Sequence, residues 1–399
     1  MAKQQSERAE IFFMAIITDR LKGTVPSLLR FVLKNLSRLY RWIMSVRLWA
    51  YEKRVVRAKI LGCQVISIGN LTVGGTGKTP VVEVFARALQ KNGRRVAILS
   101  RGYKSAKAPA GEKWKRFLTF NTPQVTPPRV VSNGERILLD SGQGGDEPYM
   151  LATNLPGVCV IVDKDRVKGG RYAIQKLGCD TLILDDGFQY LRLQHRVDIV
   201  LVDRNNPFDN GFVLPRGLLR ESQRHLRRAS FIFITKSHGD GSPELRKEIR
   251  KYNGHAEIAE CRHTPTHLRD VYSQDKRPLE FLQGKTVAAV SGIAAPRGFE
   301  ESLEKLGATL VYRRRFPDHH RYRPQEIIDT INEAKVRGAE LIVTTEKDAV
   351  RFPHLSVVDV PVYYLRIEIQ LLSGAESFQD LIARICFKPG GGEGAEALP

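Results

Sequence analysis

Apolar residues along the chain alternate between short continuous runs and stretches with helical spacing. Continuous apolar runs bounded by turn residues are typical of strands buried on both faces of a parallel sheet. Five such runs predict strands within residues 64–70, 94–103, 181–184, 197–203 and 229–236. A helical pattern begins at Lys78, after the first run and a short glycine-containing segment, and stops before Gly93, the residue type that most often ends a helix. This order predicts an α/β fold with a mostly parallel sheet.

The chain is long enough for more than one domain. It has 399 residues, and single cores seldom grow beyond ~300 residues. We therefore expect a larger domain over residues 59–278 and a second, smaller α/β lobe over 279–388, divided near the stretch RPLEFLQGKTVAAVSG. Residues 1–24 form an extension, and the glycine-rich end, residues 389–399, has the composition of a disordered tail.

Residues 25–58 are predicted to form a basic amphipathic helix. From Val25 to Trp49, cationic residues recur at helical spacing among apolar ones; they are Arg30, Lys34, Arg38 and Arg41. No apolar run approaches the ~18 to 20 residues that cross a bilayer. Such a helix suits the surface of an anionic membrane, although packing against its own domain would also explain it.

Charge and cysteine content narrow the class of protein. Lys and Arg number 63 against 43 Asp and Glu, a net charge of +20 that favours a polyanionic partner such as nucleic acid, anionic lipid or a phosphorylated substrate. The five cysteines form no CxxC pair and show no metal-ligand spacing with histidine. A disulfide framework and a zinc site are therefore disfavoured.

A glycine loop joins the first predicted strand to the first helix. Strand, glycine loop and helix in this order are typical of a P-loop that binds the phosphates of a nucleotide. Lys78 would reach the β- and γ-phosphates and Thr79 would ligate Mg²⁺. The loop is a variant, because Thr72 stands where the strict pattern has glycine, and it resembles loops of the ParA-like superfamily without that group's extra lysine. The predicted ATP-binding residues are Gly74, Gly75, Thr76, Gly77, Lys78 and Thr79.

Acidic residues at strand ends are candidates for the metal site. Asp185 and Asp186 follow a buried strand, and the carboxyl ends of parallel strands are where ligands bind in open sheets. Two solvated turn aspartates are the simpler explanation. Glu221 could join the site. ATP is the expected nucleotide, because His238 stands where guanine-specific proteins have aspartate.

Two further motifs carry candidate catalytic groups. GGDEP places Asp146 at a predicted helix start before Pro148, where it is either a helix cap or a base for a substrate hydroxyl. FPDHH places His319 and His320 beside Asp318 in the second α/β region; the cluster could bind metal or pair with a distant carboxylate. Arg166, near a strand end, suits an anionic substrate group.

Eight motifs in order resemble one family, the tetraacyldisaccharide 4'-kinases of lipid A biosynthesis. They are GNLTVGGTGKTP, SRGYK, GGDEP, DDGFQ, LPRGLLRE, SGIAAPRGF, FPDHH and TTEKDAVR. The resemblance implies transfer of the ATP γ-phosphate to the 4'-hydroxyl of a tetraacyldisaccharide 1-phosphate, giving lipid IV-A on the cytoplasmic face of the bacterial inner membrane. It also implies a P-loop NTPase-type domain hinged to a smaller lobe, and no obligate protein partner.

The resemblance also implies roles for single residues. Asp146, His319 and Lys78 would be catalytic, and closure of the smaller lobe would bring His319 to Asp146. Arg101 and Arg166 would bind the lipid, and the residues near Mg²⁺ would be Thr79, Asp185, Asp186, Gln189 and Glu221.

Two other classes of protein explain fewer of these features. A membrane-associated P-loop ATPase switch would use the loop, but the signature lysine of such switches is replaced by Val73. A nucleic-acid-binding protein is suggested by charge alone, without an aromatic stacking motif or a helix-turn-helix pattern.

Overall fold

The computed structural model describes residues 12–74, 77–102, 127–355 and 359–386. The chain forms two compact units. Unit 1 comprises residues 1–99, 165–262 and 371–399, and unit 2 comprises residues 100–164 and 263–370. Gly75, Thr76 and the predicted tail lie outside the described residues.

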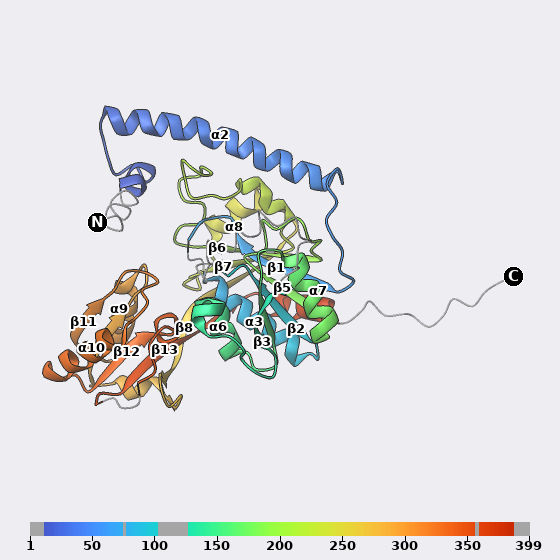
Figure 1. Ribbon diagram of the computed structural model, residues 1–399. Coiled ribbons are helices and arrows are strands. Elements are labelled where there is room, and N and C mark those ends of the chain that lie inside the picture. Colours follow the sequence, from blue (N-terminus) through green and yellow to red (C-terminus); the bar gives the residue numbers. More distant parts are fainter. Residues whose placement is uncertain (1–11, 75–76, 103–126, 356–358, 387–399) are drawn as a thin grey trace, which may run out of the picture. The chain divides into compact units, whose positions relative to one another are not determined.

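Unit 1 contains a parallel α/β sheet (Figure 1). Its strand order is β8-β7-β6-β1-β5-β2, and every neighbouring pair is parallel. The strands are β1 (Gln64–Asn70), β2 (Val96–Ser100), β5 (Thr181–Asp185), β6 (Val197–Asp203), β7 (Phe231–Thr235) and the first part of β8 (Glu257–Asp270). Each of the five predicted apolar runs coincides with one of these strands, with β5 extending one residue further, so the predicted fold class is confirmed.

Helices and a 3₁₀ turn complete unit 1. They are α2 (Thr24–Glu52), α3 (Lys78–Lys91), α7 (Arg166–Leu177), α8 (Pro243–Arg250), α12 (Ala375–Cys386) and the 3₁₀ helix η1 (Gln223–Arg228). The core under β6 and β7 is formed by large apolar side chains such as Val200, Ile232 and Ile234, with Leu245 and Ile249 of α8 packed against them.

The predicted basic helix is present as α2, a single long helix (Figure 1). Side chains of α2 bond to the rest of unit 1. Ser37 donates to the Val213 carbonyl at 2.6 Å, and Tyr40 Oη donates to the Arg220 carbonyl at 3.1 Å. Many of its large apolar side chains are exposed, among them Leu28, Phe31, Leu39, Trp42 and Trp49. None of the helices among the described residues is both long enough and apolar enough to cross a membrane.

Unit 2 contains four parallel neighbouring strands and an antiparallel pair of strands. The parallel order is β11-β10-β12-β13, and β3 pairs with β4 antiparallel. The strands are β3 (Arg129–Asn133), β4 (Cys159–Val162), β10 (Thr286–Ser291), β11 (Thr309–Arg315), β12 (Leu341–Thr345) and β13 (Val362–Ser373). The short β9 (Lys276–Arg277) pairs with the end of β8.

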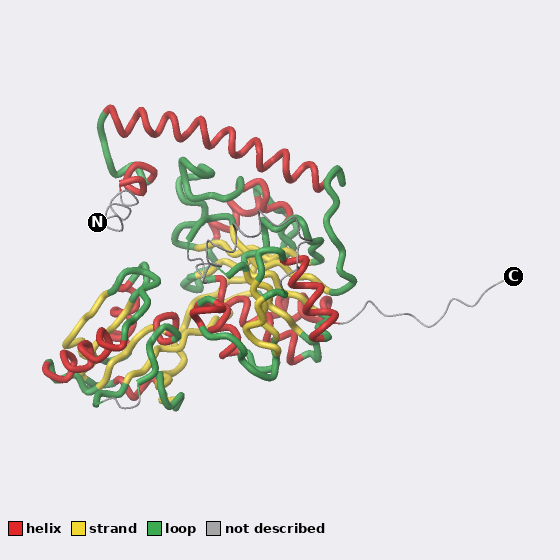
Figure 2. The backbone as a smooth tube through the Cα atoms, viewed as in Figure 1, coloured by secondary structure: helices red, strands yellow, loops and turns green. Residues whose placement is uncertain are grey.

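Alternation along β10 places two cores on the two faces of this sheet. Val287 and Ala289 join the core that includes Phe299 and Leu303 of α9 (Pro296–Lys305). The intervening Ala288 and Val290 join the core of α10 (Pro324–Val336) on the other face, as the period of two in a strand requires. The remaining helices are α5 (Ser141–Gly144), α6 (Asp146–Asn154), η2 (Leu279–Leu282) and α11 (Glu346–Ala349). Figure 2 shows the helices and strands along the backbone.

The division into units differs from the single boundary expected near residue 279. Residues 100–164 group with the carboxyl-terminal lobe, and α12 groups with unit 1. The chain passes between the units four times, at 99/100, 164/165, 262/263 and 370/371. The last two points lie inside β8 and β13. No linker composition marks these points, because the residues there are strand residues. The domain limits given above stay a prediction.

Candidate active site

The glycine loop ends where α3 begins, with Lys78 as the first helical residue. Gly77 is the N-cap and has φ 79°, and Gly74 has φ 123°; both values favour glycine, which lacks the clashing Cβ. The Lys78 ammonium donates to Asn70 Oδ1 at 3.2 Å and lies 3.6 Å from Asp186 Oδ1. The cation therefore stands at the amino end of a helix, as phosphate binding requires.

Asp186 follows β5 in a left-handed backbone conformation, with φ 54°. Its Oδ2 accepts from Arg220 Nη1 at 2.6 Å. Burial raises the pKa of Asp186, but the charges of Lys78 and Arg220 outweigh burial and hold the pKa below its ordinary value. Asp185 is buried at the end of β5, so of the two adjacent acids Asp186 is the one that faces these cations.

The residues predicted near Mg²⁺ have different hydrogen-bond partners. Gln189 donates to the Asn70 carbonyl at 3.0 Å. Glu221 is buried, and its Oε2 lies 2.8 Å from His225 Nδ1 and 2.7 Å from Arg228 Nη2. Thr79 is the second residue of α3. Within the described ranges, no three or more His, Cys, Asp or Glu side chains are grouped as a metal site would need.

Two oxygen atoms nevertheless fit a hard cation. Asp186 Oδ1 and Gln189 Oε1 are buried and accept no hydrogen bond from any described residue. Carboxylate and amide oxygens are the protein ligands that suit Mg²⁺. The donor set thus fits the ion, while Glu221 Oε2 already contacts His225 and Arg228. The metal-binding roles stay a prediction.

The two arginines expected to bind the lipid lie in different surroundings. Arg101 is exposed directly after β2. Arg166 is buried at the start of α7, where Nη2 donates to the Asp185 carbonyl at 2.9 Å and the guanidinium lies 5.1 Å from the centre of the Tyr190 ring. Arg166 therefore supports the end of β5 in this structure, and its role toward substrate stays a prediction.

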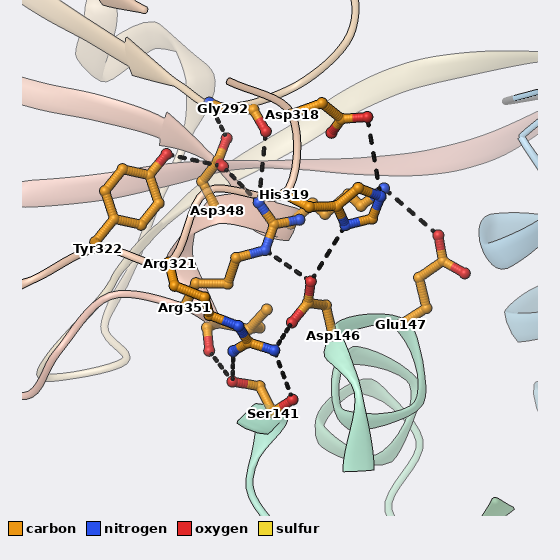
Figure 3. A network of polar contacts seen from close by, with 12 residues as sticks. Ser141, Asp146, Glu147, Gly292, Asp318, His319, Arg321, Tyr322, Asp348 and Arg351 are labelled. Carbon is orange, nitrogen blue, oxygen red and sulfur yellow. Dashed lines mark hydrogen bonds and ion pairs between the residues drawn. The ribbon is translucent and has the colours of Figure 1, made fainter. Parts of the chain in front are cut away.

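Asp146 is the first residue of α6, and its side chain does not cap the helix. The N-cap is Gly145, without a side-chain cap bond. Figure 3 shows the Asp146 carboxylate pointing at three basic side chains. Oδ2 lies 3.5 Å from His319 Nδ1 and 2.8 Å from Arg351 Nε, and Oδ1 lies 2.8 Å from Arg321 Nη2. Of the two explanations open at the sequence level, the contacts favour a functional carboxylate.

Burial and charge oppose one another at Asp146. Burial raises its pKa, but the hydrogen bond with His319 and the charges of Arg351 and Arg321 outweigh burial, so the pKa lies below its ordinary value. The carboxylate is consequently ionised at neutral pH. All of these residues belong to unit 2, so the contact between His319 and Asp146 is already present here without any closure.

His319, rather than His320, lies against Asp146. The His320 ring stacks on Phe316 with centroids 4.8 Å apart, and its Nε2 lies 3.0 Å from Glu326 Oε2 at the start of α10. Asn70, Arg321 and Arg351 also contact these site residues, although the sequence patterns did not predict them. Asn70 and Arg351 stand in motifs quoted above, GNLTVGGTGKTP and TTEKDAVR, but their spacing gave no signal of these contacts.

The fold and the Lys78 site together define a P-loop nucleotide-binding protein of the kinase type. Residues 29–386 match the family described as tetraacyldisaccharide-1-P 4'-kinase. This chain belongs to that family, and the resemblance seen in the eight motifs is confirmed.

Individual relatives agree with this assignment. A tetraacyldisaccharide 4'-kinase of Anaeromyxobacter dehalogenans (strain 2CP-C) is 42% identical, over 86% of this chain and 87% of its own length. One from Halothermothrix orenii is 34% identical, over 93% and 97%. The solved structure of LpxK from Aquifex aeolicus in complex with ATP has a TM-score of 0.70 at 30% identity, covering 90% of this chain and all of that one.

Proposed function

We propose that this protein transfers the γ-phosphate of ATP to the 4'-hydroxyl of a tetraacyldisaccharide 1-phosphate. The observation that carries the proposal is the Lys78 ammonium at the amino end of α3, facing Asp186, in a chain that matches the kinase family from residue 29 to residue 386. A cation there neutralises the charge that develops on a transferring phosphoryl group.

The lipid hydroxyl attacks directly, so no covalent phosphoenzyme is needed. Asp146 orients the hydroxyl and takes its proton, and His319 supports the carboxylate. Transition states of phosphoryl transfer are loose, so the proton can leave late. A carboxylate whose pKa lies below the ordinary value therefore suffices, because its main task is orientation.

Mg²⁺ fits the oxygen atoms of Asp186 and Gln189 and would offset the charge of the β- and γ-phosphates. Arg220 holds Asp186 Oδ2 and thereby leaves Oδ1 for Lys78 and the ion. Tyr40 of α2 bonds the Arg220 backbone carbonyl, which ties the basic helix to this site.

We also propose that α2 rests on the cytoplasmic face of the bacterial inner membrane. Exposed Phe31 and Trp42 accompany the cations Lys34, Arg38 and Arg41, a combination that suits an anionic lipid surface. Sedimentation with phosphatidylglycerol vesicles tests this. Trp42→Ser should weaken binding, and Val336→Ser, which replaces an even more exposed apolar residue on α10, should not. Equal binding by both variants would contradict the membrane role of α2.

Transfer of radiolabel from γ-labelled ATP to tetraacyldisaccharide 1-phosphate in detergent micelles with Mg²⁺ tests the kinase function. Label should appear in the lipid. A protein that hydrolyses ATP without labelling lipid would instead fit the membrane-associated ATPase switch.

A further inference from the structure

A fully buried guanidinium lies behind the Asp146 carboxylate. The Arg351 side chain has 0% exposure, and its Nε donates to Asp146 Oδ2 at 2.8 Å. The same oxygen faces His319 Nδ1. Arg351 and His319 both contact Asp146 Oδ2. The position of the Arg351 guanidinium therefore determines which Asp146 oxygen lies against the His319 imidazole.

A second carboxylate holds Arg351 in turn. Asp348 is also fully buried, and its Oδ1 accepts from Arg351 Nη1 at 3.1 Å and from Tyr322 Oη at 2.9 Å. Its Oδ2 accepts from the Gly292 backbone at 3.0 Å and from Thr345 Oγ1 at 2.6 Å. Asp348 therefore has four donors and little freedom to turn.

The backbone at Gly292 fits closely around this network. A Cβ there would lie 2.7 Å from Tyr322 Oη, closer than real Cβ contacts allow, and 3.0 Å from Asp348 Oδ1, tighter than most of them. The Gly292 carbonyl accepts from the His319 backbone at 3.2 Å and from Arg351 Nη1 at 3.4 Å. One peptide thus joins the segment that carries His319 to the guanidinium that holds Asp146.

The geometry points to Arg351 as a positioning residue for the reaction: anchored by Asp348, it fixes Asp146 Oδ2 against His319 Nδ1. This inference rests on the proposed kinase function. It adds a role that neither the P-loop nor the Asp146 and His319 pair contains, because Arg351 has no surface exposed to a substrate.

The pH dependence of turnover separates positioning from mere stability. Charged groups around the pair are Arg321 on Asp146 Oδ1, Asp318 at 3.9 Å from His319 Nε2, and Glu147, which Lys347 approaches to 3.5 Å. The Arg351 charge is one of the causes that hold the pKa of Asp146 below its ordinary value. Removing that charge should therefore move the acid limb of the profile to higher pH.

Arg366 offers a matched control in the same unit. Its guanidinium forms a largely buried pair with Glu346 at 2.7 Å, and Glu346 accepts from Asn154 of α6 at 2.6 Å. Arg366→Met thus breaks a comparable ion pair that also supports α6, without a contact to Asp146.

Thermal melting first identifies which of the variants Arg351→Met, Arg351→Lys and Arg366→Met are folded. The experiment then measures kcat, the KM for ATP and the KM for the lipid across pH for these variants and wild type. Arg351→Met should lower kcat about tenfold or more and move the acid limb up by roughly one pH unit, the size expected for losing an opposite charge at this distance. The KM for ATP should stay unchanged. Arg366→Met should lower Tm and leave the acid limb in place.

Arg351→Lys keeps the charge but lacks the fork that reaches both Asp146 and Asp348. It should keep the acid limb of the wild-type profile and still lower kcat several-fold. If Arg351→Met does not fold, kcat of Arg351→Lys alone tests whether Arg351 is a positioning residue. Wild-type kcat and acid limb in a folded Arg351→Met protein, or wild-type kcat in Arg351→Lys, would overturn the inference. Absence of lipid labelling by wild type would instead overturn the proposed function.

Discussion

Asp186 and Asp146 each lie where a strand or helix meets a turn, and each is held by basic side chains that lower its pKa. The Asp186 cluster, formed with Lys78 and Arg220, is partly open: the three side chains are 33%, 17% and 24% exposed. The Asp146 cluster, formed with His319, Arg321 and Arg351, has a buried pair and a more open side: Asp146 and Arg351 are 10% and 0% exposed, whereas His319 and Arg321 are 20% and 47% exposed. The first suits the entry of a charged ligand, and the second suits fixing one carboxylate.

The difference in burial predicts a difference in sensitivity. A charge paired in solvent loses little when its partner is removed, whereas a buried charge left unpaired is strongly unfavourable. Substitutions in the Asp146 cluster should therefore affect both activity and stability. Those in the Asp186 cluster should act mainly through the phosphate chemistry.

The largest effect on activity is expected at Asp146. Asp146→Ala removes the group proposed to orient and deprotonate the hydroxyl, and loss of a general base costs about 10²–10⁴-fold in rate. Lipid labelling should fall by a hundredfold or more, while binding of ATP, measured by titration calorimetry, stays within a few-fold of wild type. A variant that retains more than a tenth of wild-type turnover would remove Asp146 from the role of base.

Lys78→Met should follow, with a loss of roughly 10²–10³-fold, as when one donor to a developing charge is removed. It should lower lipid labelling and any slow hydrolysis of ATP alike, because both pass through the same phosphoryl group. Asp146→Ala should lower only the transfer to lipid. Equal effects of Lys78→Met and Asp146→Ala on hydrolysis would break the separation of roles between the two clusters.

The two clusters also differ in how far the sequence could predict them. Lys78, Thr79 and Asp186 stand at the ends of elements that apolar patterns define, and β1, β5 and α3 lie where those patterns placed them. The Asp146 cluster joins residues 173 and 205 positions apart. Periodicity is local, so only the family resemblance suggested the pairing with His319, and nothing suggested Arg351.

Two other predicted site residues are held by buried contacts, and their roles stay predictions. Arg166 donates to the Asp185 carbonyl. Glu221 Oε2 contacts His225 and Arg228. Their spacing, four and seven residues after Glu221, is a local signal that a search for basic partners would have found. The direction of a long side chain at the end of a strand depends on packing in the folded protein. Sequence patterns carry no information about that packing.

A smaller effect on activity is expected at His319. His319→Ala should lower turnover at saturating substrate about tenfold, the equivalent of one hydrogen bond to a charged group. His320→Ala is the matched control, since that ring contacts Glu326 and Phe316 rather than Asp146, and it should leave turnover within about twofold, well under the effect of one such bond. Unchanged turnover in His319→Ala would contradict the proposed support of Asp146.

The smallest expected effect concerns stability against pH, and it compares the clusters directly. The folded-state pKa of Asp146 lies below the value of ~3.9 in the unfolded chain. Its ionisation therefore stabilises the fold above that value, and the contribution is lost as pH falls through the lower folded pKa. Near neutral pH, Asp146→Asn leaves Arg351 buried without its partner, so the free energy of unfolding should fall. In acid, wild type protonates Asp146 as well, so the difference in unfolding free energy between the two proteins should close.

Asp186→Asn should also lower the free energy of unfolding near neutral pH, but by less than Asp146→Asn, since solvent screens the partners of Asp186. Urea unfolding of wild type and of each variant at several pH values measures these free-energy differences. A larger difference for Asp186→Asn than for Asp146→Asn would contradict the prediction that the Asp146 pair is the more sensitive one.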